Sequence, residues 1–160
     1  MMHEIVIIIA KYFIVLSSLA ALFVWLKLER NQKKTFILEG LIGGLIALAL
    51  AYIGSRLYHN PRPFVVGHFT PYFSHGNDNG FPSDHMLLAS VLAFMCLKYS
   101  KLWGWVLIVL AILIGTSRVI AGVHHSIDII GSAVFAALGI TLAQVVISRI
   151  SMKQTTVKDE

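Results

Sequence analysis

Charged residues, cysteine and proline are all scarce in this chain. Only 13% of its 160 residues are Asp, Glu, Lys or Arg, compared with roughly 25% in soluble domains. Cys96 is the single cysteine, which excludes an intramolecular disulfide and a thiolate metal cluster. All four prolines lie within residues 59–82, and we predict that this segment is a long loop.

Hydrophobic residues make up 57% of the chain, with a mean hydropathy of +0.77, and they form long runs. A transmembrane helix needs about 20 such residues. We predict spans at about 5–26, 35–58, 83–99, 102–117 and 127–148, the third being short for a full crossing. The fold class is therefore all-α, a polytopic membrane helical bundle of about five transmembrane helices. Residues 1–160 are expected to form one transmembrane domain, and no basic region precedes the first run, so we expect it to be retained.

Basic residues gather on one side of this topology. Because five crossings alternate sides, nine of the 13 Lys and Arg residues share one face: Lys27, Arg30, Lys33, Lys34, Lys98, Lys101, Arg149, Lys153 and Lys158. The positive-inside rule places that face, and the C-terminus, in the cytoplasm. The long loop then lies outside the cell membrane. The charges flank hydrophobic runs, so we expect the bilayer and not nucleic acid as their partner.

Three polar clusters interrupt the hydrophobic pattern on the predicted outer face, at residues 56–64, 81–85 and 117–128. Ionisable groups at membrane depth are costly, so their convergence indicates a functional site. Arg62 and Arg118 present forks of donors that match phosphoryl oxygens. Ser83 lies at the predicted start of a helix, where free amides and the helix dipole favour an anion.

The same clusters contain a nucleophile and an acid. His124 and Asp128 are four residues apart, hence on one face of a helix that begins there. The carboxylate can hold one imidazole nitrogen and leave the other free to attack. His85, from a different helix, can then protonate the leaving oxygen. Together with the anion-binding groups, these residues predict a phosphoryl-transfer site.

These residues resemble the three-part signature of the type 2 phosphatidic acid phosphatase superfamily. The matching parts are Arg62-Pro63, Pro82-Ser83-x-His85, and Ser117-Arg118 with His124 and Asp128 at the family's spacing. Asp84 stands where most members have glycine, and that form resembles the bacitracin-resistance branch, the undecaprenyl pyrophosphate phosphatases. The resemblance covers about residues 55–128.

The resemblance implies a phosphohistidine intermediate on His124, oriented by Asp128, with His85 as general acid. It implies phosphate binding by Arg62, Ser83 and Arg118, and it requires no metal or other cofactor. The implied activity is dephosphorylation of undecaprenyl pyrophosphate at the outer face of the membrane. Alternatives are a phosphatidylglycerophosphate or phosphatidate phosphatase and, more remotely, a small anion transporter. The oligomeric state is left open.

Two features depart from the family pattern. The family has a lysine seven positions before the arginine, where this chain has Ser55. Arg56 is expected to replace that lysine as a phosphate-binding residue, with Lys11 as the other candidate. The family core commonly has six helices, and with five predicted here we expect the first of the usual set to be missing. We expect His59, His68 and His75 to be solvated loop residues, and His125 to be a neighbour of the site.

Overall fold

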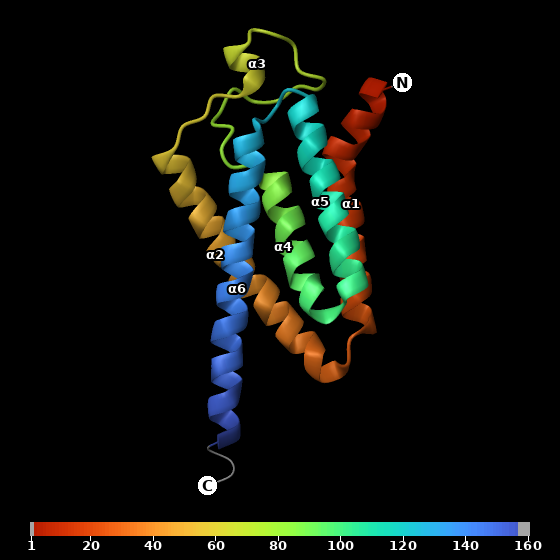
Figure 1. The fold of residues 1–160 in the computed structure, drawn as a ribbon, viewed down its shortest axis with the longest axis vertical. Coiled ribbons are helices and arrows are strands. Elements are labelled where there is room, and N and C mark those ends of the chain that lie inside the picture. Colours follow the sequence, from red (N-terminus) through yellow and green to blue (C-terminus); the bar gives the residue numbers. More distant parts are fainter. Residues whose placement is uncertain (1, 157–160) are drawn as a thin grey trace.

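The computed structural model of the protein describes residues 2–156, with side chains described for residues 2–150. In this part of the chain, loops connect the helices α1 (Met2–Lys27), α2 (Arg30–Leu57), α3 (Pro63–Val66), α4 (Asp84–Tyr99), α5 (Lys101–Ile120) and α6 (Ser126–Thr156). The five long helices correspond to the five predicted spans (Figure 1). The all-α fold class is therefore confirmed.

Four of these helices, α1, α2, α5 and α6, are long and apolar enough to cross a membrane. α4 has 16 residues, which at about 1.5 Å per residue is shorter than a hydrocarbon core of about 30 Å. Figure 1 shows that α4 begins well below the upper ends of α5 and α6. The start of this helix is therefore set back into the bundle.

Helix ends differ from the predicted spans where polar residues continue a helix. α2 begins at Arg30 rather than near residue 35, because Glu29 and Gln32 form a reciprocal capping box at its start. α6 continues to Thr156 rather than ending near residue 148. Hydropathy marks only the apolar part of such helices. Among the basic residues counted above, the side chain of Lys153 and all of Lys158 lie outside the described part.

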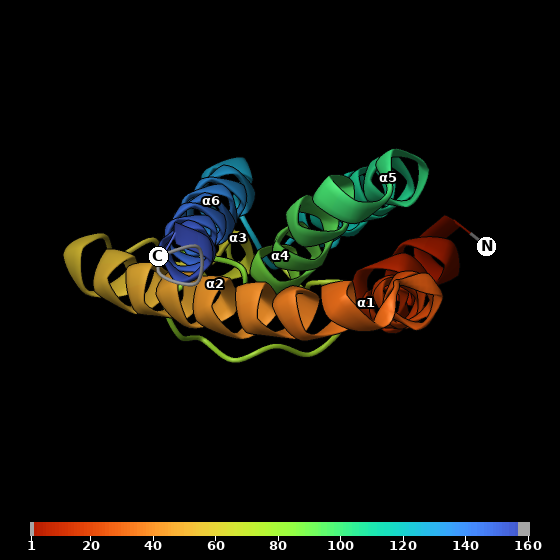
Figure 2. The same ribbon diagram turned by 90° about the horizontal axis from the view of Figure 1, so that it is seen from below.

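Small residues bring the helices close together. A Cβ atom at Gly139 of α6 would collide with the backbone of α2 at Gly43 and Ala47, so these two helices cross in direct contact. Ala10, Ala89 and Ala136 are likewise fully buried between helices. Close approach through small residues is typical of membrane helices. Figure 2 shows α2 running along one side of the bundle, beside α6 and α4.

Large apolar side chains cover the outside instead. They include Leu45, Leu57, Trp105 and Ile130, and Leu57 is 82% exposed. A water-soluble monomer does not expose apolar surface on this scale. These faces are suited to lipid.

A buried carboxylate ties α2 to α4 at the end away from the long loop. Glu39 has no exposed surface and is paired with Lys98. It also accepts a hydrogen bond of 2.9 Å from the Tyr99 hydroxyl. A charge at this depth is tolerable because it is paired and hydrogen-bonded.

The three polar clusters meet at one end of the bundle. Residues 58–83, which include α3, cover the end where α1 begins, and the link between α5 and α6 lies at the same end (Figure 1). The C-terminal end of α6 lies at the other end. The start of α1 and the end of α6 are thus at opposite ends of the bundle, as an odd number of crossings requires.

Candidate active site

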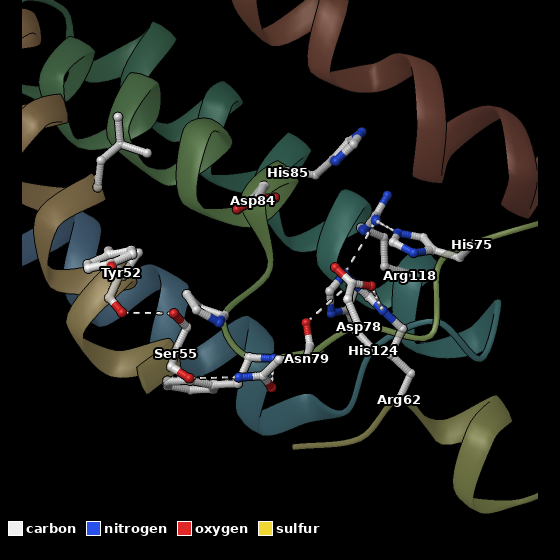
Figure 3. A pocket seen from close by; sticks show the side chains of 14 residues that line it. Tyr52, Ser55, Arg62, His75, Asp78, Asn79, Asp84, His85, Arg118 and His124 are labelled. Carbon is white, nitrogen blue, oxygen red and sulfur yellow. Dashed lines mark hydrogen bonds and ion pairs between the residues drawn. The ribbon is translucent and has the colours of Figure 1, made fainter. Parts of the chain in front are cut away.

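A polar cavity of about 500 Å³ opens at this end of the bundle. Residues from α2, the α2–α3 link, the α3–α4 loop, α4, α5 and the α5–α6 link line it (Figure 3). Its ionisable residues are Arg62, His75, Asp78, Asp84, His85, Arg118 and His124. The structure thus brings together residues from all three polar clusters.

His124 lies at the bottom of this group with 2% of its surface exposed. Its Nδ1 atom lies 3.0 Å from the carbonyl oxygen of Gly80 and 3.3 Å from Oδ2 of Asp128. Both partners only accept hydrogen bonds, so Nδ1 carries the proton. Nε2 lies 3.3 Å from Nη1 of Arg62 and 3.3 Å from Nη2 of Arg118. The Nε2 lone pair therefore faces the two groups that are suited to hold a phosphate.

Asp128 is fully buried near the start of α6 and is held by three donors. Besides His124, the amide of Asn60 donates to its Oδ1 at 2.7 Å, and the backbone N–H of His125 donates to its Oδ2 at 2.8 Å. These bonds balance the desolvation of a carboxylate. Asn60 thereby becomes part of the site, although no sequence spacing indicated it. The ring of His125 lies 3.1 Å from the Pro61 carbonyl oxygen, so it is the neighbour that we expected.

Each of the two arginines is oriented by further contacts. Arg62 donates through Nη1 to the carbonyl of Val123 at 2.9 Å and through Nε to Asp78 at 3.0 Å. Arg118 donates through Nη1 to the carbonyl of Ala10 in α1 at 3.2 Å. Both arginines are at least 95% buried. Their forks are thus fixed before any anion binds.

His85 lies in the first turn of α4 and lines the same cavity. Figure 3 shows its ring on the α4 side, across from Arg62 and His124. An acid at this position is on the opposite side of the cavity from the nucleophile, as protonation of a leaving group requires.

Ser83 is the N-cap residue of α4 and is fully buried. Its backbone N–H donates to the hydroxyl of Ser132 at 2.8 Å, and its carbonyl accepts from the same hydroxyl at 2.9 Å. Its own hydroxyl has no hydrogen-bond partner among the described residues. Its neighbours Pro82 and Asp84 line the cavity. The backbone amide of Ser83 itself is therefore occupied within the protein, whereas its hydroxyl is not.

The structure does not bring Arg56 or Lys11 to this group. The Arg56 guanidinium lies 5.1 Å above the Tyr52 ring and donates to its hydroxyl at 3.3 Å. Ser55, one residue earlier, lines the cavity instead. Successive residues of a helix are about 100° apart, so only one of them faces inward. Lys11 is exposed, with its Nζ 5.5 Å from the Phe73 ring centre.

Three loop residues that were not predicted from the sequence also belong to the site. His75, expected to be solvated, lies 3.2 Å from Nη2 of Arg118, whereas His59 and His68 are exposed as expected. Asp78 pairs with Arg62. Asn79 fastens the loop to the end of α2, since its amide donates to two backbone carbonyls there at 2.9 and 3.0 Å. A polar loop without a spacing motif carries no signal for such roles.

Burial and charge set the protonation of the loop groups. Burial lowers the pKa of His124 from its ordinary value of 6.5, and the hydrogen bond to Asp128 opposes that shift only in part. The Arg62 guanidinium lowers the pKa of Asp78. His124 is thus neutral and Asp78 ionised at pH 7. A neutral imidazole with a free Nε2 is the form that acts as a nucleophile.

Comparison with known proteins identifies the family of the chain. The family model of the PAP2 superfamily matches residues 36–152, a range that contains all three polar clusters. The chain belongs to the PAP2 superfamily. It is a membrane hydrolase of lipid phosphates, as its family and its apolar helices indicate.

Two curated relatives and one solved structure are similar to this PAP2 protein. Undecaprenyl-diphosphatase BcrC of Bacillus subtilis is 32% identical over 137 residues, which cover 86% of this chain and 70% of that one. The bacitracin transport permease protein BcrC of Bacillus licheniformis is 29% identical over 139 residues, which cover 86% of this chain and 68% of that one. A PAP2 type phosphatidylglycerolphosphate phosphatase from Bacillus subtilis shares the fold, with a TM-score of 0.65 and 22% identity over 93% of this chain and 78% of that one.

Proposed function

We propose that this PAP2 protein removes the terminal phosphate of undecaprenyl pyrophosphate at the outer face of the cell membrane. The observation that carries the proposal is the placement of His124. Its Nδ1 proton is held by Gly80 and Asp128, and its Nε2 lone pair faces Arg62 and Arg118. This arrangement supports in-line attack on a bound phosphoryl group.

In the first step, Nε2 of His124 attacks the terminal phosphorus and forms an N–P bond. The P–O bond to the lipid monophosphate breaks, and His85 donates a proton to that leaving oxygen. Arg62 and Arg118 neutralise charge on the transferred group. In the second step, water attacks the phosphohistidine, His85 takes the proton from the water, and inorganic phosphate leaves. His124 returns to its neutral form.

An apolar groove next to the cavity supports a substrate with a long tail. A space of about 340 Å³ between α2 and α4 is lined by apolar residues such as Leu87 and Val91. It shares Leu48 and Asp84 with the polar cavity. A second apolar space of about 390 Å³ continues it toward α1, sharing Gly44, Leu88 and Val91. A headgroup in the cavity thus has a path for its chain toward lipid.

The names of the relatives favour a pyrophosphate of undecaprenol among lipid phosphates. The B. subtilis relative is named an undecaprenyl-diphosphatase. A phosphatidylglycerophosphate or phosphatidate phosphatase is the second candidate, since the solved structure bears such a name and the same attack serves either substrate. One relative is named a transport permease. The polar cavity lies at one end of the bundle, whereas transport sites are typically near the midplane.

The charge distribution supports the outer face. Seven of the nine basic residues assigned to the cytoplasm have described side chains, and they lie in the parts of the helices away from the cavity: Lys27, Arg30, Lys33, Lys34, Lys98, Lys101 and Arg149. Under the positive-inside rule, the cavity then opens to the exterior. Undecaprenyl monophosphate would be formed there for reuse in cell-wall synthesis.

Phosphate release from purified protein in detergent tests the proposal. The panel contains undecaprenyl pyrophosphate, phosphatidate and phosphatidylglycerophosphate, each with and without excess chelator, and His124→Ala is the inactive control. We expect the highest kcat/KM for undecaprenyl pyrophosphate, unchanged by chelator because arginines neutralise the phosphoryl charge. Higher kcat/KM for a glycerolipid would contradict the substrate, and loss of activity restored by a divalent ion would contradict the metal-free mechanism.

A further inference from the structure

One histidine of the α3–α4 loop lines the cavity without a place in the steps above. The ring centre of His75 lies 6.0 Å from that of His124, with the rings nearly perpendicular. Its Nε2 atom lies 3.2 Å from Nη2 of Arg118. Figure 3 shows the side chain pointing from the loop toward that guanidinium. His75 is therefore beside both the nucleophile and one of its arginines.

The neighbouring arginine determines which nitrogen of His75 carries the proton. A guanidinium only donates, so Nε2 of His75 accepts from Arg118. Burial, followed by the charges of Arg62 and Arg118, lowers the pKa of His75. The ring is thus neutral at pH 7, and its single proton is on Nδ1.

This Nδ1–H group has no hydrogen-bond partner in the described part of the chain. It is buried and makes no hydrogen bond among the described residues, and Nε of Arg118 is in the same condition. An unpaired buried donor costs free energy that an acceptor would recover. Two such donors in residues that line one cavity indicate that their acceptor arrives with the substrate.

We propose that His75 is a third phosphate-binding donor: Nδ1–H donates to a non-bridging oxygen of the transferred phosphoryl group while Nε2 stays on Arg118. The inference rests on the proposed role of His124, because a phosphoryl group at Nε2 of His124 is what comes within reach of His75. It also provides the additional donor that Arg56 and Lys11, which lie outside the cavity, do not supply.

Two amide substitutions distinguish the contributions of the two nitrogens of His75. Asparagine places an N–H donor near the position of Nδ1 but does not reach Arg118. Glutamine places an acceptor oxygen near the position of Nε2 but has no donor at the Nδ1 position. We would measure inhibition by orthovanadate, which mimics the pentacoordinate phosphoryl group, for wild type, His75→Asn, His75→Gln and His75→Ala. His68→Asn, at an exposed position of the same loop, is the matched control.

We expect vanadate inhibition to weaken by about 10-fold or more in His75→Gln and His75→Ala, the loss typical of a hydrogen bond to a charged group. It should weaken less in His75→Asn and stay unchanged in His68→Asn. If His75→Asn is no better than His75→Ala, or His75→Gln is at least as good as His75→Asn, the inference is overturned. Thermal unfolding identifies folded variants, and if His75→Ala does not fold, the Asn–Gln comparison decides.

The same data separate this inference from the proposed function. A wild-type enzyme that vanadate does not inhibit would overturn both the histidine mechanism and the role of His75. Inhibition of wild type and all three variants alike would overturn the role of His75 alone. Neither result depends on which lipid phosphate serves as the assay substrate.

Discussion

The guanidinium of Arg118 donates a hydrogen bond of 3.2 Å to the backbone carbonyl of Ala10. This bond joins α1 to a residue 108 positions later that we propose to bind phosphate. Ala10 is fully buried, so nothing larger fits there without moving α1 away from α5. α1 therefore helps to orient the guanidinium of Arg118.

Ala10→Leu should impair the site through that contact. Overpacking a core position typically costs about 1–3 kcal/mol of stability. We expect such a loss together with a fall in kcat/KM of about 10-fold or more, the factor for a bond to a charged group. Ala143→Leu is the matched control, because Ala143 is also fully buried but lies toward the C-terminal end of α6, away from the cavity. Equal falls in kcat/KM for both variants would show that the contact with Arg118 has no special role.

The activity should decline in acid as His124 becomes protonated. Its pKa lies below 6.5 because of burial, so kcat/KM should fall as the pH drops through the lowered pKa. The hydrogen bond to Asp128 raises the pKa of His124. Asp128→Asn should therefore move the acid limb to lower pH and also slow turnover. Both enzymes are measured with one substrate, whose own ionisation is shared, and a shift to higher pH would contradict this assignment.

Position 55 should matter more for anion binding than position 56. The sequence predicted that Arg56 contacts phosphate, but its guanidinium packs on Tyr52 while Ser55 lines the cavity. We expect Arg56→Ala to change kcat/KM by less than about 3-fold, as a surface charge would. Ser55→Lys should strengthen inhibition by inorganic phosphate. A loss of about 10-fold in Arg56→Ala would restore the prediction made from the sequence.

The difference between these two positions shows what the sequence could and could not predict. The spacing of His124 and Asp128 suggested a helix that begins at His124. The two side chains do meet, but α6 begins only at Ser126, so His124 precedes the helix. The side of α2 that faces the cavity depends on how the helix packs against its neighbours, which hydropathy does not report. The roles of His75 and Asp78 depend on a loop that Asn79 fastens to α2 through long-range hydrogen bonds. Such bonds leave no periodic signal in the sequence.

Introduced cysteines can show on which side of the membrane the cavity opens. Asn77 is exposed in the loop over the cavity, and Gln32 lies at the start of α2 on the opposite side of the bundle. Native Cys96 is fully buried and is replaced by serine as background. We expect an impermeant thiol reagent to label Asn77→Cys in intact cells, and Gln32→Cys only after permeabilisation. The reverse pattern would place the cavity in the cytoplasm.

The central claim is that Nε2 of His124 receives the phosphoryl group, and trapping of the intermediate tests it most directly. Purified enzyme is mixed with substrate labelled in its terminal phosphate and quenched within milliseconds in alkali, where a phosphoramidate survives. Digestion and mass spectrometry then locate the label. We predict an acid-labile, alkali-stable phosphate on His124 in the wild type and in His85→Ala, and none in His124→Ala. Label on another residue, or turnover by His124→Ala at the wild-type rate, would contradict the account.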